Sequence, residues 1–242
     1  MSDLFKAGIC NADGCSVEAG QHGAVAPAVE KTIAVEIVSD VICPWCYVAK
    51  RQFERAAAIL PAGVKLSVHW RPFELNPHMP TEGLDRKIYR SRKFGSWENS
   101  RRLDAQVTAA AAQVGLTIRY DLMKSTPNTL NAHRLIWLAE KQRVQDAVVE
   151  GLFHAYFAKG RDVGDKEVLV DIAAAGGIDR TTAEAFLAGS EGSDEVADAE
   201  MAAQRSGLNG VPTFIIDGRP AFSGAQRADL MLKHMLDALG SS

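Results

Sequence analysis

The fold of this 242-residue chain is decided by one stretch, Asp40-Val41-Ile42-Cys43-Pro44-Trp45-Cys46-Tyr47. The β-branched residues 33–38 before it predict a buried strand. Residues 48–60 after it carry apolar side chains at helical spacing, and Pro61 then stops the predicted helix. Two cysteines separated by two residues therefore lie where a strand gives way to a helix.

Cys43 is expected at the amino end of that helix, because Pro44 suits the first helical position, where a missing N–H costs nothing. The free N–H groups and the positive end of the helix dipole favour the thiolate of Cys43 over its thiol. Cys46 follows about one turn later, within the reach of a disulfide bond. The pattern predicts reversible thiol–disulfide exchange, with Cys43 as the nucleophile and Cys46 as the resolving thiol.

A Cys-x-x-Cys pair can also supply half of a structural zinc site, which needs four ligands. The other cysteines are Cys10 and Cys15, which have four residues between them and lie far upstream in a loop-like segment. A zinc-dependent interaction module would have to use all four thiols, and the spacing favours redox chemistry instead. We therefore expect neither a metal ion nor another cofactor.

Composition and charge narrow the classes of partner. The chain is 47% hydrophobic and 24% charged with a net charge of −3, which gives no reason to expect a nucleic acid or an anionic membrane as partner. No apolar run approaches the ~20 residues that span a bilayer, and the first eight residues lack the basic and apolar parts of a secretory signal. We expect a cytoplasmic protein, whose oligomeric state the sequence does not indicate.

Residues 1–31 are predicted to form an N-terminal extension, because glycines and Pro27 interrupt any regular period. Cys10 and Cys15 lie within it, and the Asn, Asp and Gly between them favour a tight turn that brings the two thiols together. The pair is either a second redox pair that exchanges with or shields Cys43–Cys46, or two tail cysteines that oxidise incidentally. The sequence leaves both interpretations open.

Residues 32–80 are predicted to be the first half of an α/β fold. The alternating residues 64–70 indicate a second strand, parallel to the first because a helix connects them. His69 on this strand is a possible general base, although a packing role is the simpler interpretation.

Residues 81–206 are predicted to be a helical insertion, with helices over residues 101–115, 130–141, 145–159, 165–175, 181–188 and 194–206. A dense basic stretch near its start most simply forms a solvated helix face, and the alternative is an anion-binding surface for a glutathione-like carboxylate. Its members are Arg86, Lys87, Arg90, Arg92, Lys93, Arg101 and Arg102.

The strand pattern returns in residues 207–242, which we predict to hold a loop, two strands and a final helix over 226–239. Asp217-Gly218 is a strong signal for the turn of a hairpin. Pro212 comes one residue before an apolar strand, a position where a proline marks an edge strand or the start of a strand. The peptide bond before a proline can also be cis at a low free-energy cost.

These parts together resemble a thioredoxin-like α/β fold with a large all-helical insertion, as in the DsbA family of thiol–disulfide oxidoreductases. The resemblance is closer to the cytoplasmic, FrnE-like branch of that family. The residues that carry it are 40–47, 71–77, 127–129, 132–134, 152–157 and 210–214.

The resemblance implies a nucleophilic Cys43, a resolving Cys46, supporting roles for Pro44 and Trp45, and a cis Val211–Pro212 bond packed against the active pair. It also implies protein thiols and disulfides or low-molecular-weight thiols as partners. Some FrnE-like proteins carry an additional C-x4-C pair, whose spacing Cys10 and Cys15 share, although here the pair stands in the N-terminal extension.

The same superfamily includes kappa-class glutathione transferases and 2-hydroxychromene-2-carboxylate isomerases, which use a serine at the first active position and lack the second cysteine. This chain has both thiols. Disulfide exchange needs two sulfur atoms, whereas activation of glutathione needs one hydroxyl donor. The sequence therefore favours a thiol–disulfide oxidoreductase, with a glutathione-dependent isomerase or transferase as the alternative.

Overall fold

The computed structural model describes residues 31–240 of the chain. The elements follow one another in this order: β1 (Lys31–Ser39), α1 (Pro44–Ala57), β2 (Val64–Pro72), β3 (Leu84–Asp85), α2 (Arg86–Phe94), α3 (Trp97–Gln113), β4 (Ser125–Thr126), α4 (Leu130–Lys141), α5 (Gln145–Phe153), the π-helical turn η1 (His154–Ala158), α6 (Lys166–Ala175), α7 (Arg180–Ala188), α8 (Ser193–Arg205), β5 (Thr213–Ile216), β6 (Arg219–Ser223) and α9 (Ala228–Gly240).

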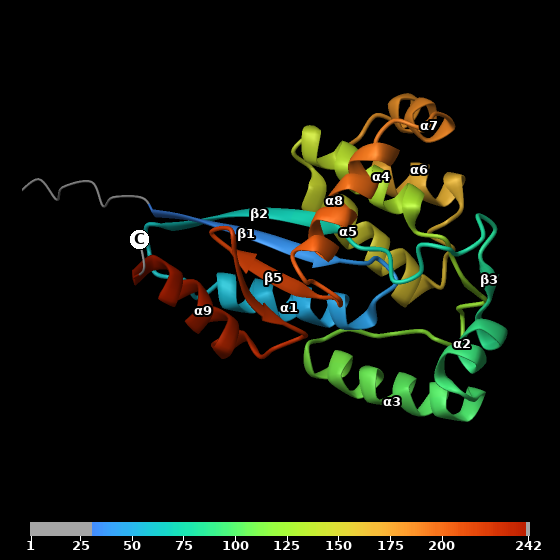
Figure 1. The fold of residues 1–242 in the computed structure, drawn as a ribbon, viewed down its shortest axis with the longest axis horizontal. Helices are drawn as coiled ribbons and strands as arrows, with labels where there is room; N and C mark the ends of the chain where they lie inside the picture. Colours follow the sequence, from blue (N-terminus) through green and yellow to red (C-terminus); the bar gives the residue numbers. More distant parts are fainter. Residues whose placement is uncertain (1–30, 241–242) are drawn as a thin grey trace, which may run out of the picture.

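Four strands form a mixed sheet in the order β2-β1-β5-β6 (Figure 1). Strands β1 and β2 are parallel, as the connecting helix predicts, while β5 runs antiparallel to both β1 and β6. The turn between β5 and β6 consists of Asp217 and Gly218, which have φ angles of 47° and 74°. A two-residue hairpin turn of type I′ requires positive φ at both positions, which Gly and Asp tolerate. The predicted hairpin is therefore confirmed.

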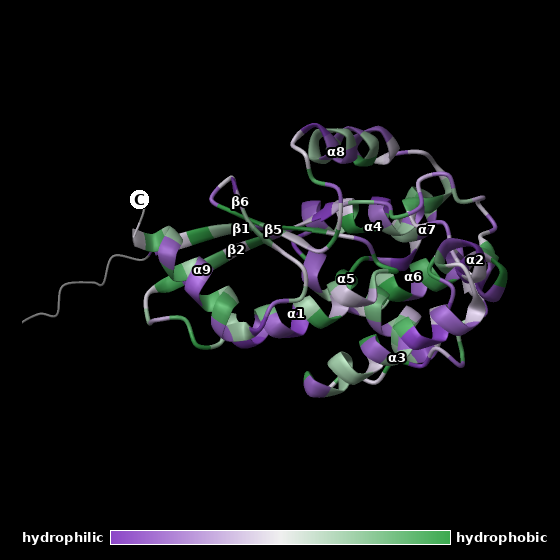
Figure 2. Ribbon diagram, turned by 60° about the horizontal axis from the view of Figure 1, so that its bottom comes forward, coloured by the Kyte–Doolittle hydropathy of each residue, from purple (hydrophilic) through white to green (hydrophobic). Residues whose placement is uncertain are grey.

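Helices α1 and α9 pack against each other on one face of the sheet, and α8 lies against β2 on the other side (Figure 1). The strands are mostly hydrophobic, whereas the helices place polar residues outward (Figure 2). Val35 and Ile37 of β1, Phe53 of α1 and Met231 and Met235 of α9 are all buried in this core. Full burial of a side chain of this size stabilises the fold by roughly 1.5–3 kcal/mol, so these residues fix α1 on the sheet.

The segment between β2 and β5 is mainly helical, and most of it lies toward one end of the sheet, while α8 packs against β2 (Figure 1). Buried apolar side chains form one continuous core that extends from the sheet into these helices. Helix α6 begins where the acidic cap predicts it, since the Asp165 carboxylate accepts hydrogen bonds from the N–H groups of Glu167 and Val168. The division of the chain at residues 31, 80 and 206 stays a prediction.

Three local features differ from the expected pattern. Helix α1 ends at Ala57 rather than at residue 60, since the N–H groups of Ile59 and Leu60 donate to carbonyls three residues back in a tighter turn. The helix expected over residues 145–159 changes to a π-helical turn at His154. A single turn is too short for the spacing of apolar residues to reveal this change. Strands β3 and β4 form a two-residue ladder. Among residues 31–240, no helix combines the length and apolar character needed to cross a bilayer.

Candidate active site

The Cys43-Pro44-Trp45-Cys46 segment forms the turn from strand β1 into helix α1. Cys43 is the residue just before the helix, with extended backbone angles (φ −85°, ψ 110°), and Pro44 occupies the first turn. The backbone N–H of Cys43 donates to the carbonyl of Asp40 over 3.0 Å, and the N–H of Cys46 donates to the carbonyl of Cys43 over 3.0 Å. Cys43 therefore lies at the positive end of the helix dipole, where the sequence places it.

The two thiols differ in their surroundings, although both are free and buried. Burial raises the pKa of the Cys46 thiol well above its usual value, and its interactions with the neighbouring Cys43 raise it further. Interactions with the Ser39 side chain and the Asp40 backbone act in the opposite direction. Cys46 is thus kept as a protonated thiol at neutral pH.

A loop from the far end of the chain completes the surroundings of Cys43. The Val211–Pro212 peptide bond is cis, as the family resemblance implies. The Cys43 thiol donates to the carbonyl oxygen of Val211, with 3.7 Å between sulfur and oxygen. The N–H of Gly224, just after β6, donates to the Pro212 carbonyl over 2.8 Å. Strand β5 and its hairpin therefore place this loop against the nucleophile candidate.

Asp40 connects the cysteine turn to two other parts of the fold. Its side chain is fully buried. One carboxylate oxygen accepts from the N–H of Ile42 over 3.3 Å, and the other accepts from the N–H of Leu75, after β2, over 2.7 Å. The imidazole of His133 in α4 lies 3.5 Å from the first oxygen. The sequence motif includes Asp40, but its contact with His133 is not visible from sequence spacing.

Two glutamates share this buried region with His133. The N–H of Glu74 donates to the Glu200 carboxylate over 2.6 Å. Burial raises the pKa of Glu74 to about 7, and burial also raises the pKa of Glu200. Burial alone would lower the pKa of His133, but the contact with Asp40 and the charges of Glu200 and Glu74 raise it overall. The pKa values of all three groups are therefore raised by their shared buried surroundings.

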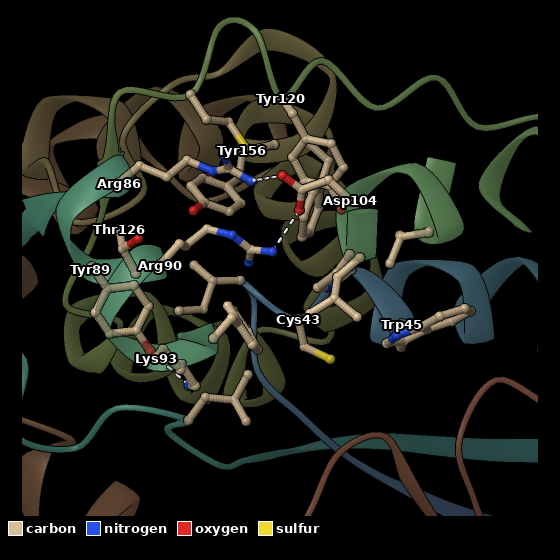
Figure 3. A pocket seen from close by; sticks show the side chains of 18 of the residues that line it. Cys43, Trp45, Arg86, Tyr89, Arg90, Lys93, Asp104, Tyr120, Thr126 and Tyr156 are labelled. Carbon is tan, nitrogen blue, oxygen red and sulfur yellow. Dashed lines mark hydrogen bonds and ion pairs between the residues drawn. The ribbon is translucent and has the colours of Figure 1, made fainter. Parts of the chain in front are cut away.

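A cavity of about 380 Å³ opens beside Cys43, between the cysteine turn and the helices α2 and α3 (Figure 3). Cys43, Trp45 and Val211 lie on one side, and basic and aromatic residues of the insertion lie on the other. Trp45 remains 40% exposed at its edge. The volume is within the range of small-molecule sites, so the nucleophile candidate faces a space that a small ligand fills. The insertion supplies these residues: Arg86, Tyr89, Arg90, Lys93, Asp104, Tyr120 and Tyr156.

Two arginines of the basic stretch point inward, which corrects the expectation of a solvated helix face. Arg86 is only 5% exposed. Arg86 and Arg90 each donate to a different oxygen of the Asp104 carboxylate over 2.7 Å. The Arg86 guanidinium also lies 4.8 Å from the centre of the Tyr120 ring. Buried charges need such partners, and the partner lies on the next helix, α3. Lys87, Arg92, Arg101 and Arg102 are exposed as expected.

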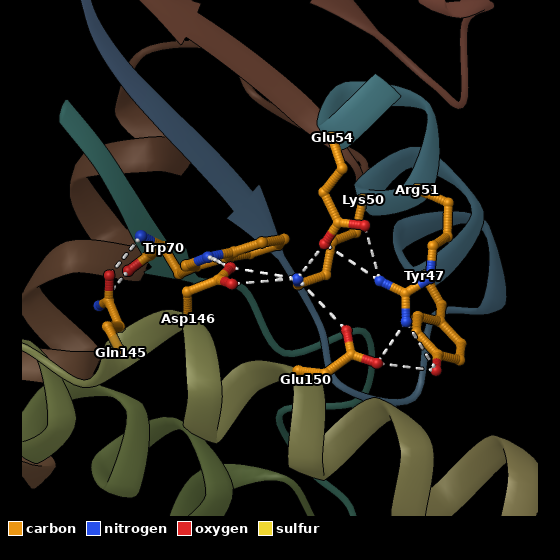
Figure 4. A network of polar contacts seen from close by, with 8 residues as sticks. All are labelled: Tyr47, Lys50, Arg51, Glu54, Trp70, Gln145, Asp146 and Glu150. Carbon is orange, nitrogen blue, oxygen red and sulfur yellow. Dashed lines mark hydrogen bonds and ion pairs between the residues drawn. The ribbon is translucent and has the colours of Figure 1, made fainter. Parts of the chain in front are cut away.

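A second polar network holds α1 against α5 (Figure 4). Lys50 is 2% exposed and lies 3.2 Å from Asp146 and 3.3 Å from Glu150. The Tyr47 hydroxyl donates to Glu150 over 3.1 Å. The buried ammonium of Lys50 needs these carboxylates as partners, so the contacts fix α1, which contains Cys46 and follows directly after Cys43.

The structure thus brings six of the predicted site residues together, namely Cys43, Pro44, Trp45, Cys46, Val211 and Pro212. His69 lies elsewhere, in contact with Glu140 over 2.7 Å. Cys10 and Cys15 fall outside the described residues, so the auxiliary pair and the zinc alternative stay untested predictions. Within residues 31–240, no group of three or more His, Cys, Asp and Glu side chains could hold a metal ion.

Comparison with known proteins places these features in a family. The sequence model of the DSBA-like thioredoxin domain matches residues 34–236. The crystal structure of probable DsbA oxidoreductase SCO1869 from Streptomyces coelicolor is 33% identical, has a TM-score of 0.78, and covers 87% of this chain and 91% of that one. The uncharacterized protein YwbO of Bacillus subtilis is 28% identical over 207 residues, which are 85% of this chain and 97% of that protein.

A third similarity concerns the fold alone. The cytosolic disulfide reductase DsbM from Pseudomonas aeruginosa, solved with GSH, has a TM-score of 0.61 at 19% identity, with 86% of this chain and 99% of that chain covered. The expected thioredoxin-like α/β fold with a helical insertion is therefore confirmed. Because the family match runs from strand β1 through the cysteine turn and the cis-proline loop into α9, this chain belongs to the DSBA-like thioredoxin domain family.

Proposed function

We propose that this protein is a thiol–disulfide oxidoreductase that exchanges disulfides through Cys43 and Cys46. One observation carries the proposal: two free, buried thiols lie together at the amino end of α1, and Cys43 faces a cavity. The helix dipole favours negative charge on Cys43, whereas burial raises the pKa of Cys46. The two sulfurs are therefore suited to different steps, attack by Cys43 and resolution by Cys46.

In the reducing direction, the Cys43 thiolate attacks one sulfur of a substrate disulfide. A bond forms between Cys43 and that sulfur, and the other substrate sulfur leaves as a thiolate that takes up a proton. Cys46 then loses its proton and attacks the Cys43 sulfur, which releases the second substrate thiolate. Two electrons have passed to the substrate, and the protein holds a Cys43–Cys46 disulfide. Two external thiols reverse these steps and restore the dithiol.

The direction of net transfer follows from the reduction potential. Stabilisation of the Cys43 thiolate by the helix dipole favours the reduced protein, which makes its disulfide more oxidising. The raised pKa of Cys46 has little effect on this balance at neutral pH, because that thiol is protonated in the reduced form, and its main consequence is that Cys46 must lose a proton before the resolving step. Pro44 and Trp45 separate the two sulfurs and adjust the balance between these effects.

We propose a cytoplasmic location and a place in the FrnE-like branch of the family. Support for the compartment comes from the similar fold of a reductase that is named cytosolic, DsbM. Support for the branch comes from the resemblance of residues 71–77 and 132–134. The substrates are protein disulfides or low-molecular-weight disulfides, and the size of the cavity favours the small ones.

The alternative is a glutathione-dependent isomerase or transferase. Such an enzyme needs one group that activates the glutathione sulfur, and a second thiol beside it has no part in that chemistry. Cys46 is buried against Cys43, which favours disulfide exchange.

The test compares three proteins, the wild type, Cys43→Ser and Cys46→Ser, in the reduction of insulin and of hydroxyethyl disulfide and in the conjugation of chlorodinitrobenzene with glutathione. We expect the wild type to reduce both disulfides and Cys43→Ser to reduce neither. Efficient conjugation by a wild-type protein that leaves both disulfides intact would contradict the proposal and support the alternative.

A further inference from the structure

The cavity beside Cys43 carries an excess of positive charge. Its lining includes three basic side chains, Arg86, Arg90 and Lys93, and one acidic side chain, Asp104. All three basic residues come from helix α2. They face Cys43 and Trp45 across the cavity (Figure 3). A cleft lined by one sign of charge attracts ligands of the opposite sign.

Asp104 neutralises the two arginines only in part. One carboxylate serves both guanidinium groups, and Arg90 directs another N–H to the hydroxyl of Ser100, which is neutral, over 2.6 Å. The hydroxyl of Tyr120, in the same wall, is buried and has no hydrogen-bond partner among residues 31–240. This inner wall therefore keeps a net positive charge and an unused polar group.

Lys93 is the basic residue whose charge is least compensated. Its ammonium donates to the Asn76 side-chain oxygen over 3.1 Å and to the Tyr89 hydroxyl over 2.7 Å, and both acceptors are neutral. No carboxylate forms an ion pair with it in the part of the chain that the structure describes. An ammonium group has three N–H donors, so one donor of Lys93 stays available at the exposed rim of the cavity.

We propose that this cavity binds a small disulfide or thiol that carries carboxylate groups, with its sulfur at Cys43 and a carboxylate at Lys93. Lys93 and the arginine pair behind it supply the electrostatic attraction, and the volume of about 380 Å³ holds a molecule of oligopeptide size rather than a folded partner. This inference rests on the proposed function, because the bound sulfur is the one that Cys43 attacks.

The test compares three disulfides that differ in charge: glutathione disulfide, which is anionic, hydroxyethyl disulfide, which is neutral, and cystamine, which is cationic. The variant is Lys93→Glu. The matched control is Lys87→Glu, because Lys87 lies on the same helix, is exposed and does not line the cavity. Both variants change the net charge of the protein by the same amount.

We expect Lys93→Glu to lower kcat/KM for glutathione disulfide about tenfold, which is the effect of one charge-assisted hydrogen bond. We expect kcat/KM to stay unchanged for hydroxyethyl disulfide and to rise for cystamine, and Lys87→Glu to behave like the wild type with all three. An equal effect of Lys93→Glu on the three disulfides, or no effect, would overturn the inference while the proposed function stands. A wild-type protein that reduces insulin but none of these three disulfides would overturn the inference alone, and one that reduces neither insulin nor any of the three would overturn the proposed function as well.

Discussion

The imidazole Nε2 of His133 lies 3.5 Å from the carboxylate Oδ1 of Asp40, and both side chains are buried. Asp40 accepts the N–H of Cys43 through its carbonyl oxygen, whereas His133 belongs to helix α4 of the insertion. Asp40, Glu200 and Glu74 together outweigh the desolvation of His133 and raise its pKa, which favours its protonated form. The contact between Asp40 and His133 therefore joins the insertion to the turn that carries the cysteines.

The first prediction concerns this pair. Asp40→Asn leaves the cation of His133 buried without its nearest counter-charge, so we expect the free energy of unfolding to fall by about 3 kcal/mol at pH 7. Urea denaturation measures the change. Asp198→Asn, on the exposed side of α8, is the control and should stay within about 0.5 kcal/mol of the wild type. Equal midpoints for the two variants would show that the pair does not stabilise the fold.

The second prediction concerns pH and Glu74, whose pKa burial raises to about 7 in the folded protein. Between about pH 4.5 and 7 the folded state keeps a proton that the unfolded state has released. Stability due to this group is fully present below that window and is lost as the pH rises through it. The pKa values of Glu200 and His133 are raised as well, so their contributions to stability are also lost as the pH rises.

We therefore expect the wild type to be more stable at pH 5 than at pH 8. Glu74→Gln should reduce that difference in the free energy of unfolding by about 1 kcal/mol, a value that allows for the partial solvent exposure of Glu74. Urea midpoints at the two pH values measure it. The groups that face Glu74 are Asp40, His133, Glu200 and the Thr129 hydroxyl. Glu82→Gln, at an exposed position, is the control. A pH dependence that Glu74→Gln leaves intact would contradict the assignment.

The third prediction concerns Ser39, whose side chain lowers the pKa of the neighbouring Cys46 thiol. Ser39→Ala removes that interaction, so the pKa of Cys46 should rise further and the resolving step should slow. We expect kcat to fall about threefold, with more mixed disulfide present in the steady state. Quenched reactions analysed by mass spectrometry measure that species. Ser39→Thr keeps a hydroxyl and should restore kcat, whereas a lower kcat without extra mixed disulfide would exclude this role.

The local parts of the site could be predicted from the sequence. Cys43 lies at the start of α1 because strand propensity, Pro44 and helical spacing all act over a few residues. The parallel pairing of β1 and β2 and the turn at Asp217-Gly218 follow from similarly short-range rules. These features need no knowledge of contacts between distant segments.

The wall opposite Cys43 could not be predicted in the same way. Arg86 and Arg90 form part of a basic stretch that is typical of a solvated face, and their burial depends on Asp104, which lies on another helix. The contact between Asp40 and His133 joins residues 93 positions apart and leaves no periodic signal. Both arrangements arise from tertiary packing, which sets the partners of buried charges.

The most direct test of the central claim is a trapping experiment with Cys46→Ser. In this variant Cys43 still attacks a disulfide, but no second thiol releases the product. After incubation with glutathione disulfide and a quench with acid, intact-mass and peptide analysis should find one glutathione bound to Cys43 in nearly every molecule, with none on Cys43→Ser. A Cys46→Ser protein that stays unmodified at Cys43 under conditions in which the wild type turns over would contradict the account.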